Sequence, residues 1–291
     1  MIRNKLIVGL QLLNFIVLLN LSSLALASSS LRINVQELNQ QLNLPGLVIL
    51  DTRSAEEYAK SHIPNAINLP EELTYFDRNK DGRIAQPAQI KPLLQSLGIE
   101  RTSPIVIYDQ GKMIKAARVF WALEVYGIEN IKVLNKGFYA WNEAMLPSNA
   151  LTPSVKPSNY VPIINHNRLA TKLTTLIATK NPNSVIIDAR SKAAYQGQIS
   201  SAARYGHIIN AINIPAMDHL ITSETASTLK SAEELKALYS GISKDQKIIL
   251  YCSIGRISST NYLTLRELGY NVSNYDASWS EWGNDFTLPI Q

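Results

Sequence analysis

The chain has 291 residues, of which 46% are hydrophobic, and its formal net charge is +5. The lysines and arginines are scattered and form no block of like charge, so nucleic acid is not an expected partner. The mildly basic balance suits at most a small anionic substrate, and the length suits two domains of ordinary size.

The first segment, residues 1–27, has the layout of a secretory signal peptide. Arg3 and Lys5 form a basic start, an apolar run follows, and A-L-A at 25–27 supplies a cleavage site. We therefore expect an exported protein, periplasmic or secreted, with no stable membrane association after cleavage. The alternative is an uncleaved membrane anchor, which the polar residues within the apolar run disfavour.

The rest of the sequence contains one pattern twice. VILDTRSAEEYAKSHIPNAINLP at 48–70 matches VIIDARSKAAYQGQISSAARYGHIINAINIP at 185–215. Further on, PIVIYDQG matches KIILYCSIG, so that Asp109 corresponds to Cys252. An internal repeat of this length predicts two copies of one domain.

The repeat sets the expected domain boundaries. We expect an N-terminal domain at 28–147 and a C-terminal domain at 166–291. Between them, residues 148–165 belong to a stretch rich in Pro and Ser, which is typical of an exposed linker.

Each copy alternates short apolar runs with stretches of helical period. Continuous apolar runs of four or five residues are typical of buried parallel strands. These runs lie at 48–51, 105–108, 184–188 and 247–251. Helices are expected at 90–98 and at 231–241, the second opened by a Ser cap with Glu three positions on. The pattern predicts an α/β fold in which each copy is a small, mostly parallel sheet with helices on both faces.

Cys252 is the only cysteine in the chain. An unpaired thiol in an exported protein suggests a reactive role, although a buried, inert cysteine is the alternative. Its position favours reactivity, because it follows a predicted strand at the sheet edge where open α/β sheets bind ligands. The loop after it leads into a helix that Ser258 or Ser259 would cap. Loop amides, the helix dipole and the charge of Arg256 would together favour the thiolate.

The sequence resembles the tandem-domain rhodaneses. The resemblance rests on D-x-R-S, G-H-I-x-x-A-x-x-I-P and a strand–Cys–loop–helix unit, set within two copies of one domain. These rhodaneses include thiosulfate and 3-mercaptopyruvate sulfurtransferases, and the resemblance covers nearly all of the chain after residue 27. It implies that the first copy, with Asp109, is inactive. It also implies that Cys252 takes a sulfane sulfur from a small anionic donor such as thiosulfate. The resulting persulfide then passes its sulfur to a thiol or to cyanide.

The resemblance also implies the remaining site residues, and it implies neither a cofactor nor a metal. The loop amides that would hold the persulfide belong to Ser253, Ile254, Gly255, Arg256 and Ile257. Arg204 would help to bind the anionic donor, and the alternative is a surface arginine in an insertion. The loop CSIGRI lies between the C-R-x-G-x-R of thiosulfate enzymes and the C-G-S-G-V-T of mercaptopyruvate enzymes. Arg256 favours thiosulfate, and 3-mercaptopyruvate is the alternative donor.

Residues that recur in both copies are expected to be structural, because the first copy has no cysteine. Asp188 and Arg190 correspond to Asp51 and Arg53, which suggests an ion pair or a loop brace. The histidines shared by the two copies, His62 and His207, are expected to be hydrogen-bonded supports.

Three other interpretations compete with parts of this account. Residues 77–88 begin like a calcium loop, but position 12 is Ala88, so a polar Asp-Gly turn is the simpler interpretation. A Cys-x5-Arg phosphatase is disfavoured because Ser258 stands where the arginine would be. A non-enzymatic persulfide carrier or redox partner protein is the remaining alternative.

Overall fold

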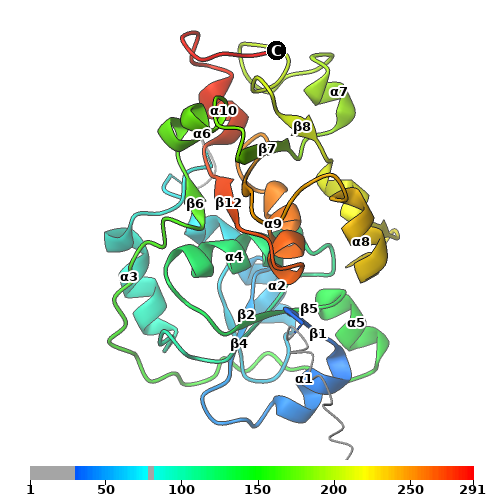
Figure 1. The fold of residues 1–291 in the computed structure, drawn as a ribbon. Helices are drawn as coiled ribbons and strands as arrows, with labels where there is room; N and C mark the ends of the chain where they lie inside the picture. The colour runs from blue at the N-terminus through cyan, green and yellow to red at the C-terminus, as the bar shows by residue number, and fades with distance from the viewer. Residues whose placement is uncertain (1–29, 78–81) are drawn as a thin grey trace, which may run out of the picture.

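The computed structural model describes residues 30–77 and 82–291 (Figure 1). The expected signal peptide, residues 1–27, lies outside the described residues, as do positions 78–81 of the calcium-like stretch. Within the described part, no helix has both the length and the apolar content needed to cross a membrane.

The N-terminal half is built on a five-stranded parallel sheet with the strand order β1-β5-β4-β2-β3. The strands are β1 (Arg32–Ile33), β2 (Val48–Asp51), β3 (Ala66–Asn68), β4 (Ile105–Tyr108) and β5 (Ile131–Leu134). The helices are α1 (Val35–Gln41), α2 (Ala55–Lys60), the 3-10 helix η1 (Glu71–Thr74), α3 (Pro87–Ser96), α4 (Ile114–Val125) and α5 (Gly137–Glu143).

The C-terminal half repeats this topology with the strand order β6-β12-β11-β7-β8. The strands are β6 (Leu169–Ala170), β7 (Ser184–Asp188), β8 (Ile212–Asn213), β11 (Lys247–Tyr251) and β12 (Val272–Tyr275), with an antiparallel pair β9 (Leu220–Thr222) and β10 (Ser227–Leu229). The helices are α6 (Lys172–Ala178), α7 (Lys192–Tyr195), the 3-10 helix η2 (Ala216–His219), α8 (Ala232–Leu238), α9 (Ser258–Glu267) and α10 (Ser278–Trp282). The predicted α/β fold and its duplication are confirmed.

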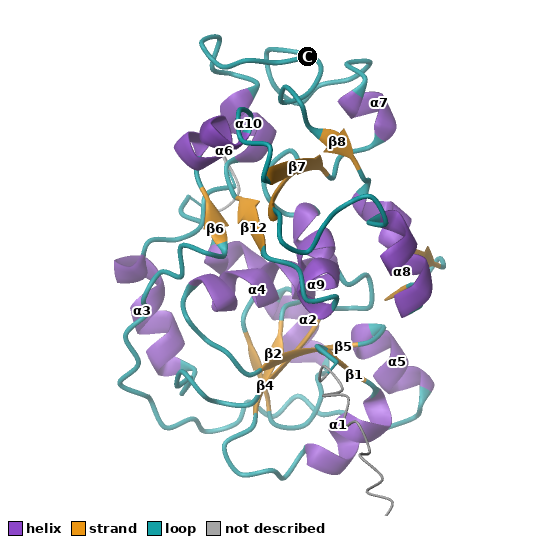
Figure 2. Cartoon of the chain, in the orientation of Figure 1, coloured by secondary structure: helices purple, strands orange, loops and turns teal. Residues whose placement is uncertain are grey.

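Helices cover both faces of each sheet (Figure 2). In the N-terminal half, α1 and α5 pack on one face, while α3 and α4 pack on the other. In the C-terminal half, α6 and α10 cover one face, and α8 and α9 cover the opposite one. Because successive strand residues point to opposite faces, the continuous apolar runs supply both cores.

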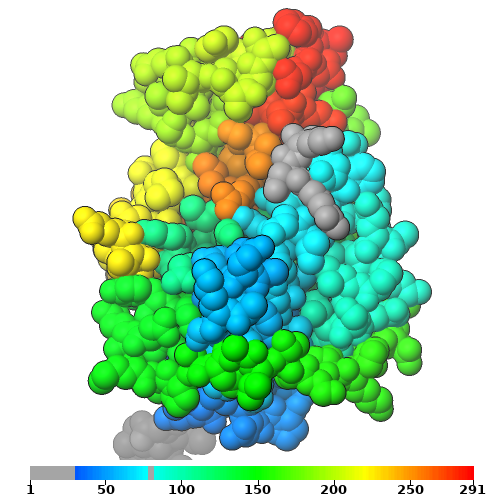
Figure 3. Space-filling model, turned by 180° about the vertical axis from the view of Figure 1, so that it is seen from behind, coloured from blue at the N-terminus to red at the C-terminus, as the bar shows by residue number. Residues whose placement is uncertain are grey.

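The two halves share one apolar core, in which α4 packs against α9 (Figure 1). The rings of Phe120 and Tyr262 meet there with centroids 6.3 Å apart. At the margin of the contact, Glu124 accepts from Tyr262 and pairs with Arg266. Seen from behind, segments of the two halves lie against one another along their boundary (Figure 3). The C-terminal half is therefore held in a fixed position against its copy.

Two predicted helices differ at their ends from the structure. The helix expected at 90–98 begins at Pro87, because Gln86 and Gln89 form a capping box and proline suits the first helical turn. The helix expected at 231–241 has the predicted box of Ser231 and Glu234 but ends at Leu238, before the glycine. The segment 148–165 has no helix or strand, and Tyr160 within it is buried against the N-terminal half.

Candidate active site

Cys252 lies at the carboxyl end of β11, which is flanked in the sheet by β7 and β12. Its amide donates to the Ser278 hydroxyl over 3.1 Å, and its carbonyl accepts from the Trp279 amide over 3.0 Å. The residue is 1% exposed and packs with Ala189 and Ala216. The start of α10 therefore fixes the backbone of the cysteine at the base of the loop 252–257.

The Ser258 hydroxyl lies 3.4 Å from the Cys252 sulfur and 2.8 Å from the Asn274 amide oxygen. Its one proton can go to either acceptor. The expected Ser cap of the following helix is wrong, because the N-cap is Ile257 and Ser258 is the first helical residue. The hydroxyl is thereby available to the sulfur, where an O–H donor stabilises a thiolate. The contacts of Ser258 and Asn274 with this site were missed from sequence.

A cavity of about 590 Å³ opens beside the thiol. Its wall includes Ala189, Ala216 and Ile257, the same residues that pack around Cys252. Polar and charged residues complete the wall, among them Arg190, Lys192, Asp218 and Ser253. Cys252 itself is not among the lining residues, so a small donor in this cavity would lie against the residues that pack around the sulfur.

The N-terminal half supports the loop through the buried guanidinium of Arg118 on α4. Nη1 donates to the Gly255 carbonyl over 3.1 Å, and Nη2 donates to the Gly82 carbonyl over 3.2 Å. The guanidinium stacks on the rings of Tyr75 and Trp121, at 4.2 and 4.4 Å from their centroids. Holding the Gly255 carbonyl fixes the peptide plane of the loop. The sequence held a signal for this role, because Arg118 is the one charged residue in the apolar stretch 116–123 of α4.

The two halves also contact each other closely at Gly82. A Cβ atom on Gly82 would overlap the carbonyl oxygen of Ile254, and the φ of +77° at this position favours glycine as well. Asp276, which follows β12, accepts from the Ile84 amide over 2.8 Å. The loop after η1 is thus pressed onto the loop of the cysteine.

Arg256 does not contribute an uncompensated charge to the rim of the cavity. Its Nε lies 2.9 and 3.0 Å from the two carboxylate oxygens of Glu71 on η1. This hydrogen bonding raises the pKa of Arg256 against the lowering effect of burial. The expectation of a free positive charge is therefore corrected, because a carboxylate from the other half neutralises it. The reason for preferring thiosulfate, which rested on Arg256, is removed with it.

Arg204 holds the C-terminal segment of the chain. Nη1 donates to the Leu288 carbonyl over 2.8 Å, and Nη2 donates to the carbonyls of Trp282 and Asp285. Arg204 is not among the residues that line the cavity. Its role in donor binding stays a prediction, and its contacts are those of a structural support.

The first copy shows how the corresponding loop surrounds a carboxyl group. Asp109 occupies the position of Cys252, and its carboxylate is buried within the loop 109–113. Burial raises the pKa of Asp109, while the amides of Gly111 and Met113 lower it; the Gly111 amide donates over 2.8 Å. The amide cup predicted for the persulfide, formed by residues 253–257, stays a prediction that this comparison supports.

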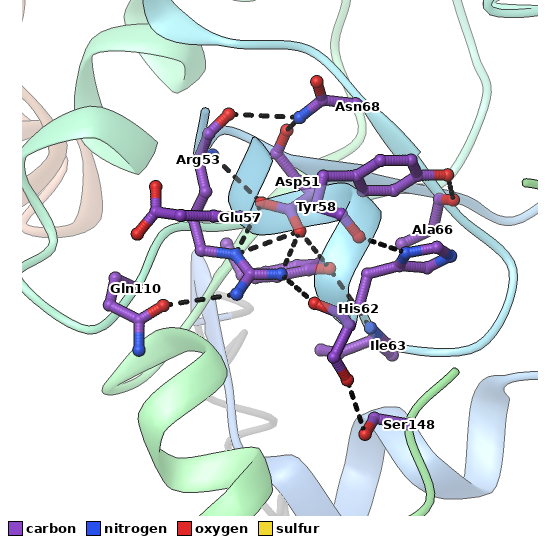
Figure 4. Close-up of polar contacts among 12 residues, drawn as sticks. Asp51, Arg53, Glu57, Tyr58, His62, Ile63, Ala66, Asn68, Gln110 and Ser148 are labelled. Atoms are coloured by element: carbon purple, nitrogen blue, oxygen red, sulfur yellow. Dashed lines mark hydrogen bonds and ion pairs between the residues drawn. The ribbon is translucent and has the colours of Figure 1, made fainter. Parts of the chain in front are cut away.

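Residues shared by the copies have the expected structural roles. Asp188 pairs with Arg190 and accepts from the Tyr251 hydroxyl over 2.6 Å. The histidines stack on neighbouring tyrosines and hydrogen-bond through Nδ1 to the carbonyls of those tyrosines; they are His62 on Tyr58 and His207 on Tyr195. Figure 4 shows the set in the first copy, with Arg53 paired to Asp51.

Comparison with known proteins agrees with this geometry. The family model described as "Rhodanese-like domain" matches residues 34–144 and 169–285. The chain therefore belongs to the rhodanese-like domain family, in a tandem arrangement.

Several curated relatives span most of the chain. It is 34% identical over 249 residues to the "Sulfur carrier protein TtuD" of Thermus thermophilus, covering 80% of this chain and 86% of the relative. It is 30% identical to the "Thiosulfate sulfurtransferase" of Azotobacter vinelandii, covering 91% and 98%. The crystal structure of the 3-mercaptopyruvate sulfotransferase SseA from Escherichia coli superposes with a TM-score of 0.76 and 26% identity, covering 86% and 99%.

Within the described residues, no three His, Cys, Asp or Glu side chains gather as a candidate metal site.

Proposed function

We propose that this chain is a sulfurtransferase that moves a sulfane sulfur from thiosulfate, or a related small anionic donor, to a thiol or to cyanide. The observation that carries the proposal is the position of Cys252. This residue ends the strand β11, touches the wall of the cavity and has the Ser258 hydroxyl against its sulfur. Relatives that span most of the chain are named as sulfurtransferases.

The first half-reaction is a displacement at sulfur. The Cys252 thiolate attacks the outer sulfur of thiosulfate, the S–S bond of the donor breaks, and sulfite leaves with the electron pair. The enzyme is left with a persulfide whose charge rests on the terminal sulfur. The Ser258 hydroxyl, which lies beside the Cys252 sulfur, would stabilise that charge together with the amides that open α9 and the helix dipole behind them.

The second half-reaction restores the thiolate. A thiolate or cyanide acceptor attacks the terminal sulfur, the persulfide S–S bond breaks, and Cys252 keeps the electron pair. The first copy has no counterpart of this step, because the carboxylate of Asp109 stands in place of the nucleophilic sulfur.

The proposal covers two classes of sulfur donor. Relatives are named for thiosulfate and for 3-mercaptopyruvate, and Glu71 neutralises the arginine that distinguished them. The leaving group separates the two, since thiosulfate releases sulfite and 3-mercaptopyruvate releases pyruvate.

A sulfur-carrier role is the second candidate, because one relative is named as a sulfur carrier protein. A carrier would exchange persulfide with a partner protein and turn over slowly with small donors. The 1% exposure of Cys252 favours the enzyme, because a buried sulfur admits a small molecule more readily than a protein thiol.

Export is proposed on the sequence of residues 1–27 alone. Expression in a bacterial host, followed by the N-terminal mass of the periplasmic fraction, tests it. A chain that begins at Ser28 supports cleavage, and an intact Met1 in the membrane fraction supports the anchor.

The proposal is tested by turnover with thiosulfate and cyanide, measured as thiocyanate, and by turnover with 3-mercaptopyruvate, measured as pyruvate. Wild type should be active with at least one donor, and Cys252→Ser should be inactive with both. Equal activity in the two proteins would refute the role of Cys252.

A further inference from the structure

One nitrogen beside the cavity has no hydrogen-bond partner. Arg190 is 3% exposed, and its Nε and Nη2 bind the Asp188 carboxylate. Nη2 also donates to the Gly206 carbonyl, whereas the buried Nη1 is unpaired. An unpaired buried donor on a charged group is costly and uncommon, so the position calls for a functional explanation.

In the first copy, the corresponding nitrogen has a hydrogen-bond partner. Arg53 pairs with Asp51 in the same way, and its Nη1 donates to the Gln110 side-chain oxygen over 3.2 Å (Figure 4). The guanidinium groups lie alike in the two copies, over Phe138 at 3.9 Å and over Trp279 at 4.4 Å. The difference therefore arises from the residue opposite Nη1.

That residue in the second copy is Ser253. Gln110 follows Asp109 as Ser253 follows Cys252. The backbone contacts agree, since the Gln110 carbonyl accepts from the Tyr139 amide and the Ser253 carbonyl accepts from the Ser280 amide. A serine side chain is two atoms shorter than that of glutamine, so it cannot reach Nη1 as the Gln110 amide does.

Arg190 and Ser253 both line the cavity beside the thiol. Lys192 and Asp218 also line the cavity, with opposite charges, and Asp188 compensates Arg190. An anion there would be held by a directed N–H group and not by an excess of positive charge.

We propose that Nη1 of Arg190 binds an anionic oxygen of the sulfur donor, in the place that the Gln110 amide oxygen takes in the first copy. Arg190 is then a residue that determines specificity for donors with a sulfonate or carboxylate group. This inference rests on the proposed function and specifies how its donor is anchored. It also gives the first copy a second reason for inactivity, since Gln110 fills the anion position there.

The test installs the glutamine of the first copy in the second. In a Cys252→Ser background, which performs no transfer, sulfite and pyruvate are titrated by calorimetry with and without Ser253→Gln. The glutamine should weaken the binding of whichever anion the parent binds by about tenfold, the loss of roughly one charge-assisted hydrogen bond. Sulfite binding would assign a sulfonate donor, and pyruvate binding a carboxylate donor.

Two control variants distinguish the effect of hydrogen bonding to Nη1 from the effects of side-chain size and of the copy in which the glutamine stands. Ser253→Leu has similar size without an amide oxygen, and it should bind the anion at least about threefold more tightly than Ser253→Gln. Gln110→Ser, in the first copy, should leave anion binding unchanged. Equal weakening by leucine and glutamine, or no weakening by glutamine, would overturn the inference.

Turnover gives an independent readout. In the protein with Cys252 intact, Ser253→Gln should raise the KM for the anionic donor about tenfold and change kcat much less, because the anchor acts mainly on binding. If the variant enzyme is active and both its KM and its anion affinity are unchanged, the role of Arg190 is overturned, while the proposed function stands. Absence of turnover in wild type would count against the proposed function, while the calorimetric result would still judge the anchor.

Discussion

Replacing Arg118 by methionine removes the guanidinium that the N-terminal half places against the loop of Cys252. The change deletes donors to the carbonyls of Gly255 and Gly82, and hydrogen bonds to charged groups contribute about 1.5–3 kcal/mol each. Asn274 still donates to the Gly255 carbonyl, which limits the loss there. We expect the free energy of unfolding to fall by about 3 kcal/mol at pH 7.

The same variant should change the dependence of stability on pH. Burial raises the pKa of Asp276 above its usual 3.8, whereas the Ile84 amide and the charge of Arg118 lower it. Without Arg118 this pKa rises further, so the ionised carboxylate is disfavoured more strongly in the folded state. The contribution of Asp276 to the stability of the variant is then greatest below the unfolded pKa and is lost as pH rises through the folded one. The deficit relative to wild type should therefore be smaller near pH 4 than at pH 7.

Urea unfolding followed by tryptophan fluorescence measures these changes, since all four tryptophans are buried. Arg101→Met is the matched control, because that arginine is exposed and pairs with Glu129 on the surface, where no measurable loss is expected. Persulfide formation in Arg118→Met should also slow about tenfold, as the loop peptide loses its support. A variant as stable as the control, with an unchanged rate, would refute the role given to Arg118.

Three further changes test two residues of the site and the buried histidine of η2. Glu71→Gln should release the charge of Arg256 toward the rim and lower the KM for thiosulfate at low salt, an effect that added salt removes; a KM independent of Glu71 would contradict it. Ser258→Ala should slow persulfide formation about tenfold without unfolding the protein, and a stopped-flow rate equal to wild type would count against the hydroxyl contact. Burial lowers the pKa of His219 from 6.5 to about 4, so about 3 kcal/mol of stability should be lost as pH falls through that interval. His219→Gln should flatten this slope in urea unfolding, and an unchanged slope would refute the assignment.

Four strands, two in the middle of each sheet, could be predicted closely from sequence. The apolar runs at 48–51, 105–108, 184–188 and 247–251 match β2, β4, β7 and β11 residue for residue. Strands buried on both faces carry nearly continuous apolar side chains, which makes these runs easy to recognise. The duplication placed both sheets, because each copy repeats the other's order of elements.

The partners of the site residues could not be predicted in the same way. Arg256 shows a charge in the sequence, but Glu71 lies 185 positions away and meets it only through the packing of the halves. Ser258 suits a helix cap by local rules, and the sulfur of Cys252 becomes its neighbour only when the loop closes. Copy-to-copy comparison identified Asp109 as the substitute for the cysteine, but only the structure showed that Gln110 pairs with Arg53.

The persulfide on Cys252 is the central claim, and intact mass spectrometry tests it most directly. The purified protein is exposed to thiosulfate, and its mass and the released sulfite are measured in the same sample, beside Cys252→Ser. The account predicts a gain of one sulfur atom on wild type alone, with an equal amount of sulfite, and removal of that sulfur by cyanide. An unchanged mass with thiosulfate and with 3-mercaptopyruvate, or an equal gain on the serine variant, would contradict it.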